Sequence, residues 1–205
     1  MDFILDKAKK LDMKLWILDD SHFPTGYANG RIKSDYPQYL KKYLDMRRYD
    51  VQGPLRRARI DFSLLKGRPW DKPDPEQEIL KVLLAKRISQ RTEKRDPVIA
   101  ESICDITEQM NRESRLLTLD VPEGAWSIFV VYLTKKGGEQ ATQDYLNPLV
   151  REATEVLIRE VYEPHYTHYK EEFGKTIQGF FSDEPRFGNI KGTEGRMGTD
   201  MVLPW

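Results

Sequence analysis

The chain has 205 residues, and its 33 Lys and Arg residues balance its 33 Asp and Glu residues, so the formal net charge is zero. Proteins that coat nucleic acid or an anionic membrane surface need a basic excess, which this composition lacks. A single cysteine excludes an internal disulfide, and no window approaches 18 uncharged apolar residues. The N-terminal segment also lacks the long apolar region of a secretory signal. We therefore expect a cytoplasmic protein with neither nucleic acid nor a membrane as partner.

The first predicted elements are a short helix and a buried strand. Asp2 can cap an amphipathic helix, and the apolar run at residues 13–18 is typical of a strand that is covered on both faces. This strand stops abruptly at Asp19 and Asp20, and a loop with Gly, Pro and Asn follows at residues 21–30. Aromatic and leucine side chains at helical spacing then predict a helix over residues 35–48.

The middle of the chain changes to short alternating or β-branched runs. We expect strands at residues 56–65, 78–88, 99–106, 115–121 and 126–134. Pro122, Glu123 and Gly124 predict a turn that joins the last two strands into a hairpin. Loops are expected at residues 69–75 and 90–97, so this block is best explained as an antiparallel sheet.

Helical character returns after Asp144. Asn147 is a natural N-cap with Pro148 at the first helical position, and Pro164 is expected to end or kink the helix that follows. A second apolar strand is predicted at residues 176–182. It too stops at an acidic pair, Asp183 and Glu184, which Pro185 follows.

The chain thus repeats one unit, in which a helix is followed by an apolar strand, two carboxylates and a loop with proline. This order predicts an α/β fold: a partial (β/α) TIM-type barrel that is interrupted by an antiparallel β-rich insertion. The first part of the barrel is expected at residues 1–52, the insertion at 53–138 and the second part at 139–205. A full barrel takes about 250 residues, so we expect the remaining part of the same polypeptide to complete it.

Acidic residues at two strand ends suggest a hydrolytic site. Cleavage of a glycosidic bond needs a carboxylic acid beside the leaving oxygen and a second carboxylate as base or nucleophile. Glu184 suits the acid, since burial and the neighbouring Asp183 would both raise its pKa. A competing interpretation places a divalent metal among Asp19, Asp20, His22 and the second acidic pair; a simpler one makes each pair a loop or helix cap.

Several segments resemble the bacterial α-L-rhamnosidase-like glycoside hydrolases. The similar segments, in an order shared with that family, are residues 15–30, 121–126, 144–148 and 174–185. The resemblance implies a (β/α)-barrel hydrolase of plant or host glycans in which Glu184 matches the family's acid. It also implies that the partner carboxylate can lie outside this chain, in which case the chain alone is inactive.

The sequence therefore predicts a glycoside hydrolase that cleaves oligo- or polysaccharides without a cofactor or metal. Glu184 and Asp183 are the predicted catalytic residues. Predicted contacts to the carbohydrate come from Asp19, Asp20, His22, Asp144 and Asn147. A non-catalytic carbohydrate-binding or scaffold protein and a divalent-metal hydrolase remain as alternatives.

Overall fold

A computed structural model describes residues 1–63, 65, 76–89, 97–136, 139, 142–186, 188 and 203–205. The predicted loop at residues 69–75 lies outside these residues, as does the predicted loop at 90–97 except for its last residue. The chain divides into two compact units, one formed by Met1–Lys42 with Gly138–Trp205 and the other by Tyr43–Gly137. The second unit thus begins at residue 43, whereas the sequence predicted that the insertion begins at residue 53.

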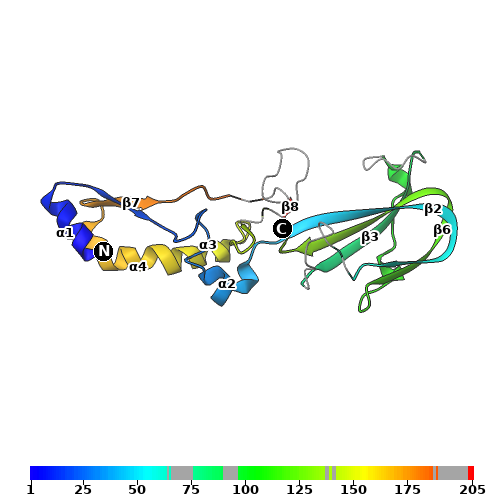
Figure 1. Ribbon diagram of the computed structural model, residues 1–205, viewed down its shortest axis with the longest axis horizontal. Coiled ribbons are helices and arrows are strands. Elements are labelled where there is room, and N and C mark those ends of the chain that lie inside the picture. Colours follow the sequence, from blue (N-terminus) through cyan, green and yellow to red (C-terminus); the bar gives the residue numbers. More distant parts are fainter. Residues whose placement is uncertain are drawn as a thin grey trace. The chain divides into compact units, whose positions relative to one another are not determined.

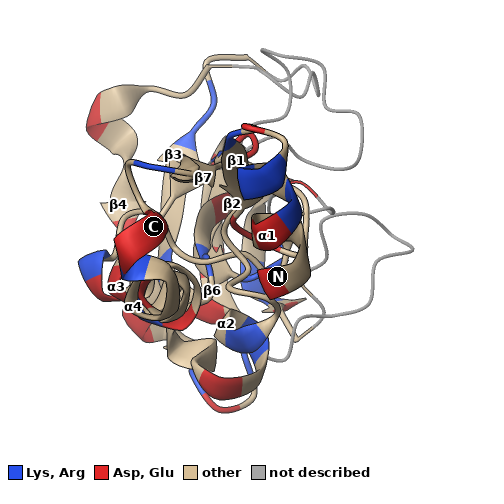
Figure 2. Cartoon of the chain, turned by 90° about the vertical axis from the view of Figure 1, so that its left-hand side faces the viewer, with Lys and Arg blue, Asp and Glu red and all other residues tan. Residues whose placement is uncertain are grey.

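The first unit carries most of the helix and a two-stranded parallel sheet (Figure 1). Its elements are α1 (Asp2–Lys10), β1 (Leu15–Leu18), α2 (Arg31–Asp35), η1 (Pro37–Tyr39), α3 (Arg151–Leu157), η5 (Ile158–Tyr162), α4 (Glu163–Tyr169), η6 (Lys170–Glu172), β7 (Ile177–Phe181) and β8 (Leu203–Pro204). Acidic and basic residues are interspersed on α1 and α3, which suits helices with one face in solvent (Figure 2).

One long helical segment runs through α3, η5 and α4 (Figure 1). Pro164, at the start of α4, neither ends nor interrupts this segment. The turn before it, η5, is π-helical. Because proline lacks an N–H and its ring crowds the preceding turn, a locally widened turn lets the helix continue past it.

The helix predicted over residues 35–48 is wrong. The chain instead forms the short α2 and the 3₁₀ turn η1, and from Tyr43 onward it is β-strand. Pro37 stands just after α2, where the residue before a proline is driven out of helical geometry. The aromatic residues at helical spacing then serve in two different elements, since strand pairing outweighs their weak helical preference.

The second unit is an antiparallel sheet. Its elements are β2 (Tyr43–Asp61), β3 (Glu78–Lys86), η2 (Ala100–Ser102), β4 (Cys104–Asp105), η3 (Thr107–Gln109), β5 (Met110–Asn111) and β6 (Leu116–Thr134). Within this unit the strand order is β4-β3-β6-β2, and β5 pairs with β6. Cys104 is exposed on the edge strand β4.

The predicted hairpin turn at Pro122–Gly124 is also wrong, because β6 continues through it. β6 pairs with β2 from Tyr43↔Thr134 to Asp61↔Leu116, and the register shifts on either side of Leu55. Gly53 faces Gly124, and a Cβ on Gly53 would lie only 1.8 Å from the Pro122 carbonyl oxygen. Both strands therefore bend at the same level, where β-bulges increase local twist and curl the sheet.

The partial (β/α) TIM-type barrel is therefore wrong as the fold class. The described chain is mostly antiparallel β, with a curled half-barrel sheet. Among the described strands, β1 and β7 form the one parallel pair. The repeated helix–strand unit of the sequence is real, but it supplies two parallel strands rather than a barrel. The long β2–β6 pair dominates the fold instead.

Each unit has its own apolar core. The second unit is built around Phe62, Val82, Leu117, Ile128 and Val130, all fully buried. In the first unit, one cluster centres on Ile32, Ala153 and Val161, and a smaller one joins Leu5 of α1 to Ile17 and Ile177 of the parallel sheet. No helix in the described part of the chain is long and apolar enough to cross a membrane.

Candidate acidic site at the ends of two parallel strands

The two acidic pairs meet at one end of the parallel sheet. β1 and β7 run parallel, with Ile17 opposite Phe180 and Leu18 opposite Phe181. The Asp19 N–H continues this ladder by donating to the Phe181 carbonyl oxygen at 3.2 Å. Since parallel strands end at the same edge of a sheet, the acids after β1 and after β7 emerge side by side. The two acidic pairs that follow the predicted strands therefore lie at one edge of the parallel sheet.

Thr25 connects the two acidic pairs directly. Its hydroxyl donates to Asp19 Oδ1 at 2.7 Å and accepts the Asp183 N–H at 2.8 Å. Its backbone N–H donates to the Asp183 carbonyl oxygen, also at 2.8 Å. The Thr25 carbonyl oxygen accepts the hydroxyl of Tyr145. One buried threonine, 3% exposed, is thus bonded to both strand ends.

Asp19 is a buried carboxylate, 3% exposed, whose oxygens face hydroxyl groups. Besides Thr25, its Oδ2 accepts hydrogen bonds from Tyr162 and Ser182. Burial raises the pKa of Tyr162 to about 12, and its hydrogen bond to Asp19 adds to the effect because an ionised carboxylate disfavours loss of the phenol proton. Three hydroxyl donors offset the loss of water around the Asp19 carboxylate and fix its orientation.

Asp20 is buried as well, at 4% exposed, but its partners are backbone groups. Its carboxylate accepts five N–H groups of the described loop, which belong to His22, Gly26, Tyr27, Ala28 and Asn29. The donor–acceptor distances run from 2.6 Å for Tyr27 to 3.2 Å for His22. The loop after β1 is therefore wrapped around the Asp20 side chain, which acts as a structural centre rather than as a group that faces a ligand.

The loop has a glycine where it passes a tyrosine ring. A Cβ on Gly26 would lie 2.2 Å from the ring of Tyr145, and the Gly26 φ of +142° disfavours other residues. Farther along, Ala28 and Asn29 adopt left-handed backbone angles that bring their N–H groups to Asp20. The small residues Gly26, Ala28 and Asn29 of this segment therefore have a structural explanation.

Glu184 presents its carboxylate to solvent. Its side chain is 67% exposed, and Arg186 Nη2 lies 3.6 Å from its Oε2. The burial on which its predicted role as an acid rested is not found. Its backbone has a φ of +42°, a left-handed conformation that is uncommon for a residue with a side chain. Asp183, half-buried beside it, is held by the backbone of Thr25 and by its hydroxyl.

The remaining predicted contact residues have local partners. His22 Nδ1 lies 2.9 Å from the Ser21 hydroxyl, and its ring packs on Tyr27 at 5.2 Å between centroids. Asp144 forms an exposed ion pair with Lys33 at 2.8 Å.

Asn147 is buried within a turn rather than directed at the acids. Its Oδ1 accepts the Leu149 N–H at 3.1 Å and its Nδ2 donates to the Trp205 carbonyl oxygen at 2.7 Å. The predicted role of Asn147 as helix N-cap is therefore wrong, because α3 begins four residues later, at Arg151, and its N-cap is Val150.

A metal centre finds no support in the described part of the chain, where no three His, Cys, Asp or Glu side chains gather as metal ligands do. Both oxygens of Asp20 are also directed at backbone N–H groups, and those of Asp19 at hydroxyls. The divalent-metal alternative therefore has no ligand set among the described residues.

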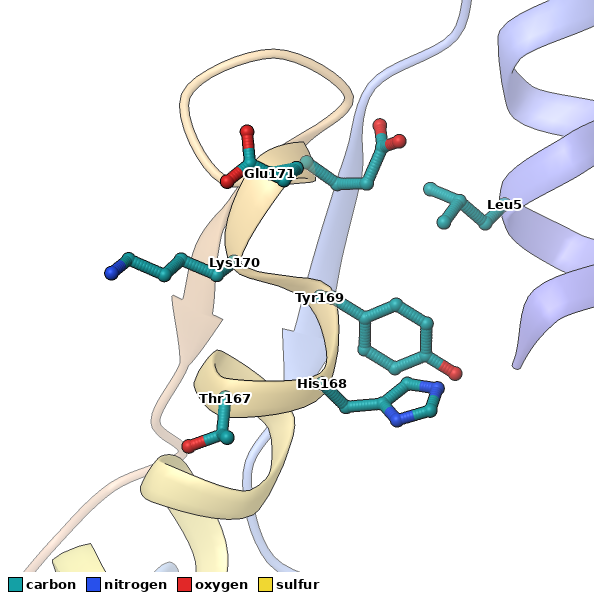
Figure 3. Close-up of a pocket in the computed structure, with 7 residues that line it drawn as sticks. Leu5, Thr167, His168, Tyr169, Lys170 and Glu171 are labelled. Atoms are coloured by element: carbon teal, nitrogen blue, oxygen red, sulfur yellow. The ribbon is translucent and has the colours of Figure 1, made fainter.

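A hollow of about 430 Å³ lies elsewhere in the first unit, against α1 and the end of α4. Tyr169 and His168 point towards Leu5 of α1, and Lys170 points away (Figure 3). The Tyr169 hydroxyl already donates to Asp2 at 2.7 Å. This hollow borders the elements that precede β1 and β7, so it is separate from the acids at the opposite ends of these strands.

Sequence reasoning missed the hydroxyl groups that hold the acids. Ser182 directly precedes Asp183 and Thr25 lies five residues after Asp20, so their closeness to the acidic pairs in sequence offered a signal. Tyr162 offered none, because it is 143 residues from Asp19 in sequence and belongs to a helix.

No protein-family model, no curated protein and no solved structure matches the chain.

Proposed function

We propose that the chain is a glycoside hydrolase, with Glu184 as general acid and Asp183 as the second carboxylate of its site. The observation that carries the proposal is the convergence of two acidic pairs at the ends of β1 and β7, joined through Thr25. Two carboxylates, Asp19 and Asp20, are occupied in holding this edge together. Of the other two carboxylates at this edge, Asp183 belongs to a half-buried residue and Glu184 is exposed.

Glu184 is the better placed of the two for proton transfer. Its exposed carboxylate can reach a glycosidic oxygen, and its left-handed backbone is the kind of local strain that concentrates at functional sites. In the proposed reaction Glu184 donates its proton to the leaving oxygen as the bond to the anomeric carbon breaks. Asp183 either deprotonates the attacking water or attacks the anomeric carbon itself, and the anomer of the product distinguishes these two outcomes.

The test is hydrolysis of a panel of aryl and alkyl glycosides and of oligosaccharides by the purified chain. Glu184→Gln is expected to lower kcat by about 10²–10⁴-fold, the usual contribution of a positioned acid. The loss should be larger for an alkyl glycoside than for a dinitrophenyl glycoside, whose leaving group needs no proton. Asp35→Asn, which changes an exposed carboxylate of the same unit that is paired with Arg31, is the matched control. A wild-type chain that hydrolyses no member of the panel refutes the proposal.

A non-catalytic carbohydrate-binding function is the second candidate, and Trp16 favours it. Its side chain is 64% exposed on β1 and lies across Gly179, where a Cβ would come within 3.1 Å of the indole. Leu18 and Phe181, paired at the end of the sheet, are exposed as well. Flat exposed aromatic rings stack on the apolar faces of sugars. Saturable oligosaccharide binding that Trp16→Ala abolishes, without turnover by the wild type, would support this candidate over the hydrolase.

A further inference from the structure

Thr25 is placed between the two carboxylate pairs as no other described residue is. It lies in the loop after β1, whereas Asp183 follows β7, 158 residues farther along the chain. Its three contacts with the acids use three different groups: the hydroxyl proton to Asp19, the hydroxyl oxygen from the Asp183 N–H, and the backbone N–H to the Asp183 carbonyl. A hydroxyl is the smallest side-chain group that can donate and accept at once.

The position of Thr25 is itself fixed from the other side. The Tyr145 hydroxyl donates to its carbonyl oxygen, and the Tyr145 ring packs edge-on against Tyr27 with 5.4 Å between centroids. The ammonium group of Lys41 lies 4.8 Å from the centre of the same Tyr145 ring. These three side chains are buried, so the carbonyl of Thr25 is held by a rigid, packed support.

The two acidic pairs depend on Thr25 to different degrees. Asp19 keeps hydrogen bonds from Tyr162 and Ser182 if the Thr25 hydroxyl is removed. The Asp183 N–H has the Thr25 hydroxyl as its partner, and Glu184 is the next residue along the backbone. Loss of the hydroxyl therefore acts chiefly on the backbone that carries the proposed catalytic carboxylates.

We infer that Thr25 is the positioning residue of the site, in that its hydroxyl sets the place of Asp183 and Glu184 relative to the end of β1. The inference rests on the proposed glycosidase function for its consequence in catalysis, but the hydrogen bond itself can be measured without any substrate. A small misplacement of catalytic groups lowers kcat by up to about 10²-fold, while binding made by other groups is retained. Removal of the hydroxyl should accordingly lower kcat and leave KM nearly unchanged.

The experiment compares Thr25→Val with Thr25→Ser in the full chain. Valine keeps the β-branched shape and removes the hydroxyl, whereas serine restores the hydroxyl. Thr107→Val is the matched control in the second unit: Thr107 is 4% exposed, donates to Asp105 and accepts the Val82 N–H. The two readouts are hydrogen exchange of the Asp183 amide, followed by NMR, and kcat and KM on the glycoside panel.

In Thr25→Val we expect the Asp183 amide to exchange about tenfold faster or more, because its acceptor is gone. We expect kcat to fall by about 10- to 100-fold at nearly constant KM. Thr25→Ser should restore both values, and Thr107→Val should change neither. If Thr25→Val does not fold, Tyr145→Phe removes the hydrogen bond to the Thr25 carbonyl and should move both readouts in the same direction.

The outcomes separate the inference from the proposed function. If the wild type hydrolyses nothing, the glycosidase proposal fails, and the Asp183 amide still shows whether Thr25 holds the second strand end. If the wild type is active, an unchanged kcat in Thr25→Val overturns the inference and leaves the glycosidase standing. Unchanged exchange of the Asp183 amide overturns it in either case.

Discussion

Replacing Asp20 by alanine tests the view that this carboxylate organises the loop after β1. The substitution removes the acceptor of five backbone N–H groups in the described loop. The amides of Gly26, Tyr27 and Ala28 are buried, so water cannot easily replace the lost oxygens there. The amides of His22 and Asn29 are only partly buried and can turn to solvent.

The magnitude follows from the three buried amides. Each buried donor left without a partner costs about 1–3 kcal/mol, so their sum is about 3–9 kcal/mol. Relaxation of the loop lowers this sum, and about 3 kcal/mol or more is the expected loss for Asp20→Ala. A domain has a total stability of about 5–15 kcal/mol, so the change threatens the fold of the first unit.

Asp20→Asn sharpens the test. An amide keeps one oxygen but points an NH₂ group at backbone N–H groups, so we expect most of the alanine effect despite the near-identical size. Asp144→Asn is the control, because that carboxylate forms only an exposed ion pair with Lys33 and contributes about 0–1 kcal/mol.

The assay is urea unfolding combined with hydrogen exchange of the peptide that covers residues 22–30. We expect Asp20→Ala and Asp20→Asn to lower the unfolding free energy and to abolish protection in this peptide first. The reasoning is refuted if Asp20→Ala changes the unfolding free energy by less than about 1 kcal/mol with the loop still protected.

Three further predictions follow from single residues. Burial lowers the pKa of Lys41 to about 8 from 10.5, so the unfolded chain holds this proton up to a higher pH than the folded chain does. The unfolding free energy, measured by urea titration, should therefore rise by up to about 3 kcal/mol as the pH rises from about 8 to 10.5. Lys41→Met should lack this gain. Glu184→Gly should be more stable than Glu184→Ala by up to about 1 kcal/mol in thermal unfolding because φ is +42°, while both lose hydrolysis; equal stabilities would contradict the left-handed backbone. Leu117→Ala, at a fully buried site in the second unit, should lower the unfolding free energy by about 2–5 kcal/mol, and a loss below about 1 kcal/mol would show that the core is loosely packed.

The parallel strand pair could be predicted from sequence because its signals are local. Residues 13–18 and 176–182 are short apolar runs that each end in two acids, and a helix precedes each one. These patterns predict buried strands whose polar ends face the same way. The structure has β1 and β7 within these ranges and pairs them in parallel. The predicted cover on both faces of the strand is wrong, because Trp16, Leu18 and Phe181 are exposed.

For the second unit, the sequence could predict only the structural class, antiparallel β. Short alternating runs correctly indicated antiparallel structure, but the extent of β2 and β6 depends on cross-strand pairing. Pro122 and Gly124 read as a turn when β6 is considered alone. Opposite them stand Gly53 and Pro54 of β2, so two turn-like segments meet and become a shared bend. A single sequence does not show which segments will face each other.

The barrel was predicted by extending one correct observation too far. Two repeats of helix, strand and acids fit a barrel edge, but they fit any pair of parallel strands equally well. The repeats fix the geometry of β1 against β7 and do not specify how many strands lie beside them. The antiparallel sheet, formed by strands that pair over long sequence distances, then dominates the described fold.

The two acidic pairs look equivalent in sequence, and the physical difference between them lies in the chain that follows. After Asp20 the loop turns back and offers five described amides to the Asp20 carboxylate. The hydroxyls of Thr25, Tyr162 and Ser182 bind Asp19, so both members of this pair are withdrawn from solvent. After Glu184 comes Pro185, which has no N–H to donate, and Glu184 itself takes a left-handed backbone. The first pair therefore becomes scaffold, and the second remains with an exposed carboxylate. This asymmetry, rather than the presence of four acids, is why we propose Glu184 as the residue that transfers the proton.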